Sequence, residues 1–337
     1  SNEDQRFKLF YFIKTDDKQL IKRRFEDRNI PLTNVVFLSI WNNRFKSLLE
    51  WLEFSWKLKA HRIKLLQVVM INSPEDQIPQ LERLSKSSLK LAFTVTYNAI
   101  PTAFESNHDP RFERDRKKYG AIFSRIDFDG LLSWYDHIVP FVHSSDLFES
   151  KPPVQVINSR FCDSSRYYPE EKENWIVFAS ALVNYKHPMM FVEAIQKVRK
   201  SRPELLSGWK VKIIGNGPLQ EATDEYIKAN DLQDLVERTS GLDDISPILR
   251  KSKAYVSAQE TENFPSLAMN EAMASGNVII ARDVGRTHLF VKHGENGFLT
   301  PRDQDNADGL GECLLAFLSN ADDHERMMDS SVKLTQT

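Results

Sequence analysis

Short apolar runs alternate with longer amphipathic stretches along the first half of the chain. The apolar runs predict β-strands, and the stretches in which apolar residues recur at helical spacing predict helices. The expected strands cover residues 7–13, 35–40, 65–71, 89–96 and 137–142. The expected helices cover residues 18–27, 44–59, 78–85 and 119–134. Strands that alternate with helices in this way indicate an α/β fold with a doubly wound, mostly parallel sheet.

A second series of strands and helices begins after a polar stretch. Pro152-Pro153 and the polar residues 162–174 interrupt the pattern, which indicates a domain boundary near residues 155–172. The expected strands of this series cover residues 154–157, 175–178, 209–214, 235–239, 254–257 and 277–281. The expected helices cover residues 189–200, 219–230, 245–251 and 267–275. The sequence therefore predicts two α/β domains.

Composition narrows the classes of function. The 337 residues are 41% hydrophobic and 27% charged, which is globular composition and excludes disorder as the main state. Lys and Arg number 45 against 47 Asp and Glu, a balance that gives no electrostatic indication of a nucleic-acid partner. No apolar run approaches the ~20 residues that span a bilayer. The two cysteines, Cys162 and Cys313, favour a reducing, cytoplasmic setting, and the eight histidines show no metal-ligand spacing, so we expect no metal and no cofactor.

Glycine is concentrated in the second half of the chain. Only Gly120 and Gly130, of 12 glycines, precede residue 200. Because backbone that approaches a phosphate closely generally needs glycine, we expect any nucleotide site to lie in the second half. Gly215-Asn216-Gly217-Pro218 follows an expected strand and precedes an expected helix, an arrangement that suits an anion at the helix N-terminus. The alternative is a plain tight turn.

A longer succession of residues carries a family resemblance. Residues 260–276 (ETENFPSLAMNEAMASG) are followed by the apolar run 278–281 and by residues 294–299 (GENGFL). This succession resembles the second domain of the family 4 (group 1) retaining glycosyltransferases, which have the GT-B fold. Other segments fall in the family's order: residues 156–159 with Tyr168-Pro169, residues 178–186, and the glycine turn. The resemblance is strong over residues 155–302 and weaker over residues 1–150.

The resemblance implies a domain organisation. We expect two facing Rossmann-like domains with mostly parallel sheets. Residues 1–155 would form the acceptor-side domain and residues 156–171 the interdomain segment. Residues 172–315 would form the nucleotide-sugar donor-binding domain, and residues 316–337 a C-terminal helical tail.

The same resemblance assigns roles to residues of the second domain. Glu271 would accept hydrogen bonds from ribose hydroxyls, and Lys186 would contact the departing diphosphate, where a cation stabilises developing charge. The backbone amides at the start of the following helix would bind the diphosphate, with a turn just before them. The expected donor-binding residues are Glu271, Gly215, Asn216, Gly217, Asn263, Pro265, Ser266, Leu267 and Ala268. The alternatives are a helix-dipole charge for Glu271 and a solvated surface side chain for Lys186.

Three positions depart from the family pattern. The family's two glutamates have seven residues between them, whereas eight separate Glu262 from Glu271, and Asn263 stands at the seven-residue spacing. We expect Glu262 to take the catalytic role of the first glutamate, with Asn263 as the alternative. Ala181 stands where the family usually has an arginine. On the acceptor side, Tyr97 and Asn98 occupy the place where a histidine is often found.

The first domain contains one basic and aromatic segment. Residues 44–64 (RFKSLLEWLEFSWKLKAHRIK) contain six basic and two acidic residues, and Phe45, Leu48, Leu49, Leu52 and Trp56 recur at helical spacing. Such a helix could lie on an anionic membrane, where lipid-linked acceptors are found. The alternative is a helix packed on the sheet with a solvated basic edge.

These inferences predict an enzyme. We expect a cytoplasmic hexosyltransferase, in peripheral contact with a membrane if the basic helix binds lipid, that moves a sugar from a nucleoside diphosphate sugar to a glycan or lipid-linked acceptor hydroxyl. The resemblance implies retention of configuration and no metal requirement. A nucleotide-sugar epimerase of similar fold, and a non-catalytic relative that binds nucleotide sugar or a partner protein, are the alternatives.

Overall fold

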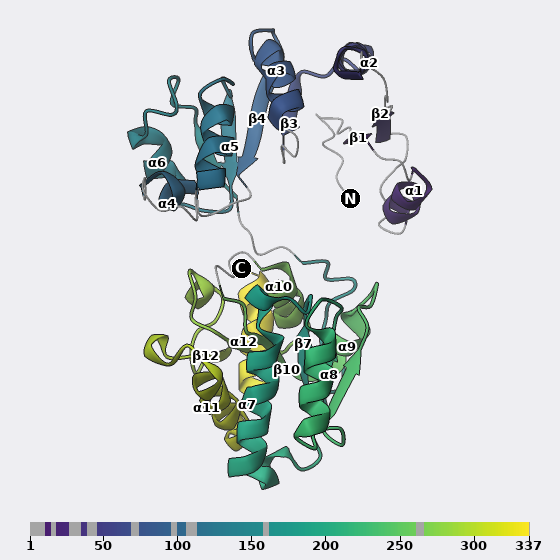
Figure 1. Cartoon of the computed structure of the whole chain (residues 1–337), viewed down its shortest axis with the longest axis vertical. Coiled ribbons are helices and arrows are strands. Elements are labelled where there is room, and N and C mark those ends of the chain that lie inside the picture. The colour runs from purple at the N-terminus through teal and green to yellow at the C-terminus, as the bar shows by residue number, and fades with distance from the viewer. Residues whose placement is uncertain are drawn as a thin grey trace. The chain divides into compact units, whose positions relative to one another are not determined.

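The computed structural model describes residues 11–14, 18–26, 35–38, 46–68, 74–95, 100–105, 113–157, 162–260 and 266–336. The chain divides into two compact units, residues Ser1–Ile157 and Asn158–Thr337 (Figure 1). Every strand pair that the structure describes is parallel. The expected α/β class with mostly parallel sheets is confirmed.

The first unit has a four-stranded sheet, in which the strands lie in the same order as in the chain. Its strands are β3 (Leu65–Val68), β4 (Lys90–Val95), β5 (Gly130–Ser133) and β6 (Val154–Val156), while β1 (Tyr11–Lys14) pairs with β2 (Val35–Leu38). The helices are α1 (Lys18–Glu26), α2 (Lys46–Ala60), α3 (Pro74–Ser85), α4 (Ile100–Glu105), α5 (Glu113–Phe123) and α6 (Ile138–Ser144). The core forms where the buried Phe93 of β4 meets Phe123 of α5, with ring centroids 5.7 Å apart.

Two predictions in the first unit are wrong. Residues 137–142 were expected to form a strand, but residues 138–142 belong to α6, in which Ile138, Phe141 and Val142 are buried. That spacing of three and four residues is the spacing of a helix face, and Pro140 is tolerated because it lies in the first turn. The helix expected over residues 119–134 ends at Phe123, and Gly130–Ser133 forms β5 between β4 and β6.

The second unit has a six-stranded sheet in the order β12-β11-β10-β7-β8-β9. The strands are β7 (Glu173–Ala179), β8 (Lys210–Ile214), β9 (Val236–Thr239), β10 (Ser252–Ser257), β11 (Val278–Ala281) and β12 (Gly297–Leu299). The helices are α7 (Pro188–Ser201), α8 (Gln220–Ala229), α9 (Ser246–Lys251), α10 (Leu267–Ala274), α11 (Ala307–Ser319) and α12 (His324–Gln336). If β7 to β12 are numbered 1 to 6, the sheet has the order 3-2-1-4-5-6, which is the doubly wound order of dinucleotide-binding folds.

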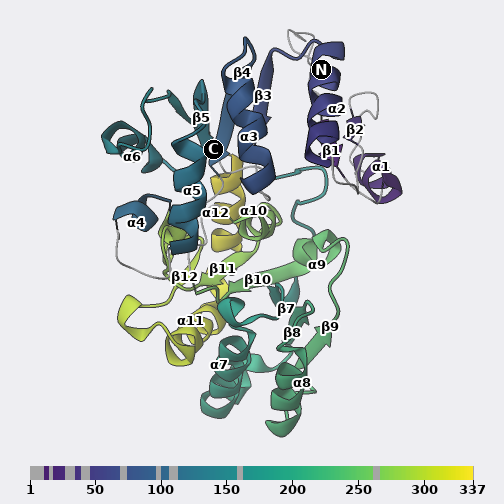
Figure 2. The same ribbon diagram turned by 45° about the horizontal axis from the view of Figure 1, so that its top comes forward.

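Successive side chains of the central strands pack alternately into two separate cores, one on each face of the sheet. Ile176 and Phe178 of β7 pack with residues of α7, α8 and α11, whereas Val177 packs on the other face with residues of α9 and α10. Side chains of a strand point alternately to opposite faces, so a strand covered on both faces is apolar throughout. The helix α12 packs against α10 and β11 and is therefore part of this unit (Figure 2).

Candidate functional site

The second sheet has a cavity where its strand order reverses. The chain proceeds from β7 toward β8 on one side and from β10 toward β11 on the other, so the loops after β7 and β10 diverge. A cavity of about 50 Å³ lies there, and its lining includes Ser180, Lys186, Gln259, Ser266 and Ala268. Open α/β sheets bind ligands at this point, beyond the carboxyl ends of the strands.

Lys186 lies in the loop after β7 and lines this cavity. Its ammonium donates a hydrogen bond to Oε1 of Gln259, which follows β10. The two loops also bond through their backbones, since the Glu260 amide donates to the Tyr185 carbonyl at 2.9 Å. Burial lowers the pKa of the Lys186 ammonium below its ordinary value. A half-buried cation at this edge is less solvated than a surface lysine and interacts more strongly with an anion.

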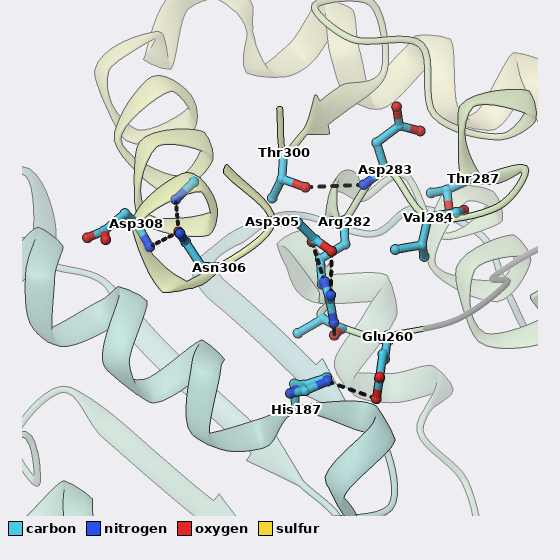
Figure 3. A network of polar contacts seen from close by, with 12 residues as sticks. His187, Glu260, Arg282, Asp283, Val284, Thr287, Thr300, Asp305, Asn306 and Asp308 are labelled. Carbon is cyan, nitrogen blue, oxygen red and sulfur yellow. Dashed lines mark hydrogen bonds and ion pairs between the residues drawn. The ribbon is translucent and has the colours of Figure 1, made fainter. Parts of the chain in front are cut away.

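A polar network fixes the loop that carries Gln259 from both sides. On one side, Nε2 of His187 lies 3.3 Å from Oε2 of Glu260 (Figure 3). On the other, Arg282 is only 5% exposed, contacts Asp305 through two nitrogens and donates to the Ala258 carbonyl at 3.1 Å. Gln259, Arg282 and Asp305 were not among the site residues predicted from the sequence. A charged residue directly after the all-apolar strand β11 was the one available signal for Arg282.

The helix α10 presents its N-terminus to the cavity. Ser266 caps the helix, because its side chain accepts a hydrogen bond from the Met269 amide at 3.2 Å. Amides in the first turn of a helix have no intrahelical carbonyl partner, and their dipoles favour an anion. Ser266 and Ala268 line the cavity, while the Leu267 side chain is 54% exposed. The structure thus brings these three predicted residues to the same edge as Lys186.

Glu271 lies in the second turn of α10 and not near its first amides. Burial raises the pKa of the Glu271 carboxyl, and the neighbouring Tyr167 side chain opposes the rise. A half-buried carboxylate offers about four acceptor positions, which suits the hydroxyl groups of a ligand. The sequence analysis did not identify Tyr167.

The glycine turn packs against the loop after β7. A Cβ built on Gly215 would lie 1.9 Å from the Ser180 carbonyl oxygen, and one on Gly217 would lie 2.4 Å from the Leu182 carbonyl oxygen. The Leu182 amide donates to the Asn216 carbonyl at 2.9 Å, and the Asn216 side chain is exposed. Glycine is thus required at both positions, because the backbones of the two loops are in contact and leave no space for a Cβ. The turn supports the loop that leads to Lys186.

Five predicted site residues lie outside the described residues. They are Tyr97, Asn98, Glu262, Asn263 and Pro265. Their roles, including the choice between Glu262 and Asn263, therefore stay predictions.

Within the described part of the chain, no three His, Cys, Asp or Glu side chains are grouped so that they could hold a metal ion. None of its helices has the length and apolarity needed to cross a bilayer.

The family model described as "Glycosyl transferases group 1" matches residues 163–333. The chain belongs to this family. The match covers the whole six-stranded sheet with its cavity, and it includes Tyr167, Lys186, Gln259 and Glu271.

Similar proteins agree with the family and the fold. An uncharacterized glycosyltransferase of Haemophilus influenzae is 30% identical to this group 1 family member over 157 residues, 46% of this chain and 42% of the relative. The UDP-N-acetylglucosamine–peptide N-acetylglucosaminyltransferase GtfA subunit of Streptococcus pneumoniae is 30% identical over 157 residues, 46% of this chain and 29% of its own length. The chain thus spans less than half the length of these relatives.

A solved structure matches both units. Anabaena HepE, in complex with UDP and glucose, superposes with a TM-score of 0.71 and 14% identity, covering 96% of this chain and 86% of HepE. At this identity the likeness concerns the fold alone. The fold is of the GT-B type, with two Rossmann-like units, as expected.

Proposed function

We propose that the chain is a glycosyltransferase that moves a sugar from a nucleoside diphosphate sugar to an acceptor hydroxyl. One observation carries the proposal: Lys186 and the N-terminus of α10, the helix that bears Glu271, line one cavity at the switch point of the second sheet. A cation and helix amides suit a diphosphate, and a carboxylate on the same helix suits ribose hydroxyls.

The donor we propose is a UDP-sugar. The pneumococcal relative is named for a UDP-N-acetylglucosamine reaction, and the HepE structure holds UDP and glucose. The diphosphate would lie against Lys186 and the amides of Leu267 and Ala268, with its ribose toward Glu271. We expect Glu262, or Asn263 in its place, to hold the donor sugar.

The reaction we propose retains the anomeric configuration and needs no metal. Bond breaking between sugar and diphosphate builds negative charge on the leaving oxygen, which Lys186 and the α10 amides stabilise. The departing phosphate itself takes the acceptor proton, so the protein contributes orientation and electrostatics rather than a general base. Transfer that persists in excess EDTA, with a product of unchanged anomeric configuration by NMR, would support both features.

The acceptor we propose is a glycan or a lipid-linked sugar at an anionic membrane, with the protein in the cytoplasm. In α2 of the first unit, Leu52 and Trp56 are 54% and 66% exposed, and these two exposed apolar side chains support the proposal. Lys59, near the end of the helix, and Arg62 and Lys64, which follow it in the chain, are also exposed. Apolar side chains bordered by lysine and arginine suit anionic lipid. Trp56→Ser should reduce flotation with phosphatidylglycerol vesicles at low salt, whereas Leu242→Ser, on the second unit, should not.

Product analysis tests the proposed function. The full chain is incubated with radiolabelled UDP-glucose or UDP-N-acetylglucosamine and with membrane glycolipid extracts as acceptors. Label that moves to the acceptor with equimolar UDP release supports transfer. Free epimerised sugar would indicate the epimerase, and UDP binding without turnover would indicate a non-catalytic relative.

A further inference from the structure

The Lys186 ammonium is held by a neutral side chain from the neighbouring loop. Lys186 ends the short 3₁₀ helix η3 (Asn184–Lys186), and its ammonium donates a hydrogen bond to Oε1 of Gln259, which follows β10. Both residues line the cavity. An ammonium has three donor hydrogens, so this bond leaves two of them for a ligand. The pair therefore presents a cation whose place is fixed and whose hydrogen-bonding capacity is not exhausted.

The carboxylate next to Gln259 in the chain has a different partner. Oε2 of Glu260 lies 3.3 Å from Nε2 of His187, and 56% of the Glu260 side chain is exposed (Figure 3). No aspartate or glutamate is among the described residues that line the cavity. A carboxylate beside Lys186 would form an ion pair with it and offset its attraction for an anion. The glutamine amide therefore holds the ammonium without cancelling its charge.

The backbone on both sides of Gln259 is fixed. On one side, the Glu260 amide donates a hydrogen bond to the Tyr185 carbonyl at 2.9 Å. On the other side, Nη1 of the buried Arg282 donates to the Ala258 carbonyl at 3.1 Å. A side chain on a fixed backbone reaches a partner only through its own rotamers. These contacts therefore limit where the Gln259 amide can hold the ammonium.

The titratable side chains around the Lys186 ammonium, within the described part of the chain, are those of two tyrosines and of the His187–Glu260 pair. The ring centre of Tyr185 lies 5.4 Å from Nζ of Lys186, and Tyr255 lines the same cavity. Burial lowers the pKa of the Lys186 ammonium. An acidic group in place of the Gln259 amide would raise that pKa, because an opposite charge favours the protonated form. The ionisation of Lys186 therefore reports on its contact with residue 259.

We propose that Gln259 is a positioning residue that holds the Lys186 ammonium beside the N-terminus of α10 and leaves its charge available to the donor diphosphate. This inference rests on the proposed function, in which Lys186 binds that diphosphate. Ser266, the N-cap of α10, lines the same cavity, so the first amides of the helix and the two remaining ammonium hydrogens suit one anion. Gln259 thus acts on the diphosphate through Lys186.

Calorimetric titration of the full chain with UDP tests the inference. Gln259→Met keeps the length of the side chain and removes the acceptor, and it should weaken UDP binding by about tenfold. Gln259→Glu should weaken binding by a similar factor at neutral pH and move the alkaline fall in affinity to higher pH. Gln233→Glu, at an exposed position ahead of β9, is the matched control and should change neither.

A double variant shows whether Gln259 acts through Lys186. In a Lys186→Gln background, Gln259→Met should add no further loss of UDP affinity. Three results would each overturn the proposal: an unchanged affinity in Gln259→Met, an alkaline fall at the wild-type pH in Gln259→Glu, or the full loss in the Lys186→Gln background.

Amine labelling without nucleotide separates this inference from the proposed function. Trace acetic anhydride reacts with the unprotonated amine, so acetylation of Lys186 across pH, read by mass spectrometry against the exposed Lys228, reports its ionisation. In Gln259→Glu the midpoint should rise by about one pH unit, whereas Gln233→Glu should leave it in place. If the wild-type chain fails to bind UDP, the proposed donor is wrong, and this midpoint alone decides whether Gln259 holds Lys186. An unchanged midpoint in Gln259→Glu would overturn the role of Gln259.

Discussion

The Cα of Gly215 and the carbonyl oxygen of Ser180 lie so close together that a Cβ on Gly215 would stand 1.9 Å from that oxygen. The contact joins the turn after β8 to the loop that leads from β7 to Lys186. No side chain fits between these two pieces of backbone unless one of them moves.

Gly215→Ala should therefore destabilise the second unit and displace the Lys186 loop. We expect a loss of about 1–3 kcal/mol, measured by denaturant unfolding, together with weaker UDP binding. Gly241→Ala is the matched control in the turn after β9, because its Cβ would meet only the Asn216 side chain, at an ordinary 3.5 Å. Equal stability of the two variants would show that the close contact is not present in solution.

Lys186 must be protonated to bind an anion, and burial lowers its pKa. UDP affinity should therefore fall on the alkaline side at a pH below the value of about 10.4 at which an ordinary lysine loses its proton. Lys186→Gln should lower transfer by about 10²-fold and abolish this alkaline limb. Lys228→Gln, which changes an exposed lysine on α8, should leave both unchanged. An alkaline limb that persists in Lys186→Gln would assign it to another group.

Lys172 joins three backbone segments at the opposite edge of the sheet. Its ammonium donates to the carbonyls of Arg250 and Ser252 at 2.9 Å each and of Ser275 at 2.6 Å. Lys172→Met removes these bonds from a half-buried place and should cost about 2 kcal/mol or more in the free energy of unfolding. Lys251→Met, at an exposed position of α9, should cost little. A similar unfolding midpoint for both variants would contradict the structural role of Lys172.

The sequence predicted the second unit closely because its signals are local. Several of its strands contain a short apolar run that is buried on both faces, as β7 and β11 do, and a glycine, proline or serine marks most of the turns between them. The strand prediction for residues 137–142 was wrong because a short apolar run is typical of a buried helix as well as of a strand. The stripe with Leu52 and Trp56 has helical spacing, but spacing alone does not say what covers a face.

The site residues divide in the same way. Lys186, Ser266 and Glu271 belong to a motif with a recognisable order, and so they could be named from the sequence. Gln259 and Arg282 act through partners that lie far away along the chain. The Arg282–Asp305 pair spans 23 residues, and the Lys186–Gln259 pair spans 73. No periodicity or spacing encodes such contacts.

The choice between Glu262 and Asn263 can be made by mutation. We expect Glu262→Gln to lower transfer by about 10²-fold while UDP affinity stays nearly intact, because this carboxylate would hold the sugar and not the nucleotide. Asn263→Ala should lower transfer only slightly, since the asparagine amide adds no charge to the contact with the donor sugar. Loss of transfer in Asn263→Ala alone would show that the register is shifted by one residue.

The central claim is that the second unit binds a nucleoside diphosphate through Glu271 and Lys186. Calorimetric titration of the full chain with UDP, compared between wild type and Glu271→Gln, tests it most directly. Loss of a charge-assisted hydrogen bond to ribose should weaken binding by roughly 1.5–3 kcal/mol. Glu221→Gln, at an exposed position in the first turn of α8, is the control and should bind UDP like the wild type. Equal UDP affinity in wild type and Glu271→Gln, with the fold intact, would contradict the account.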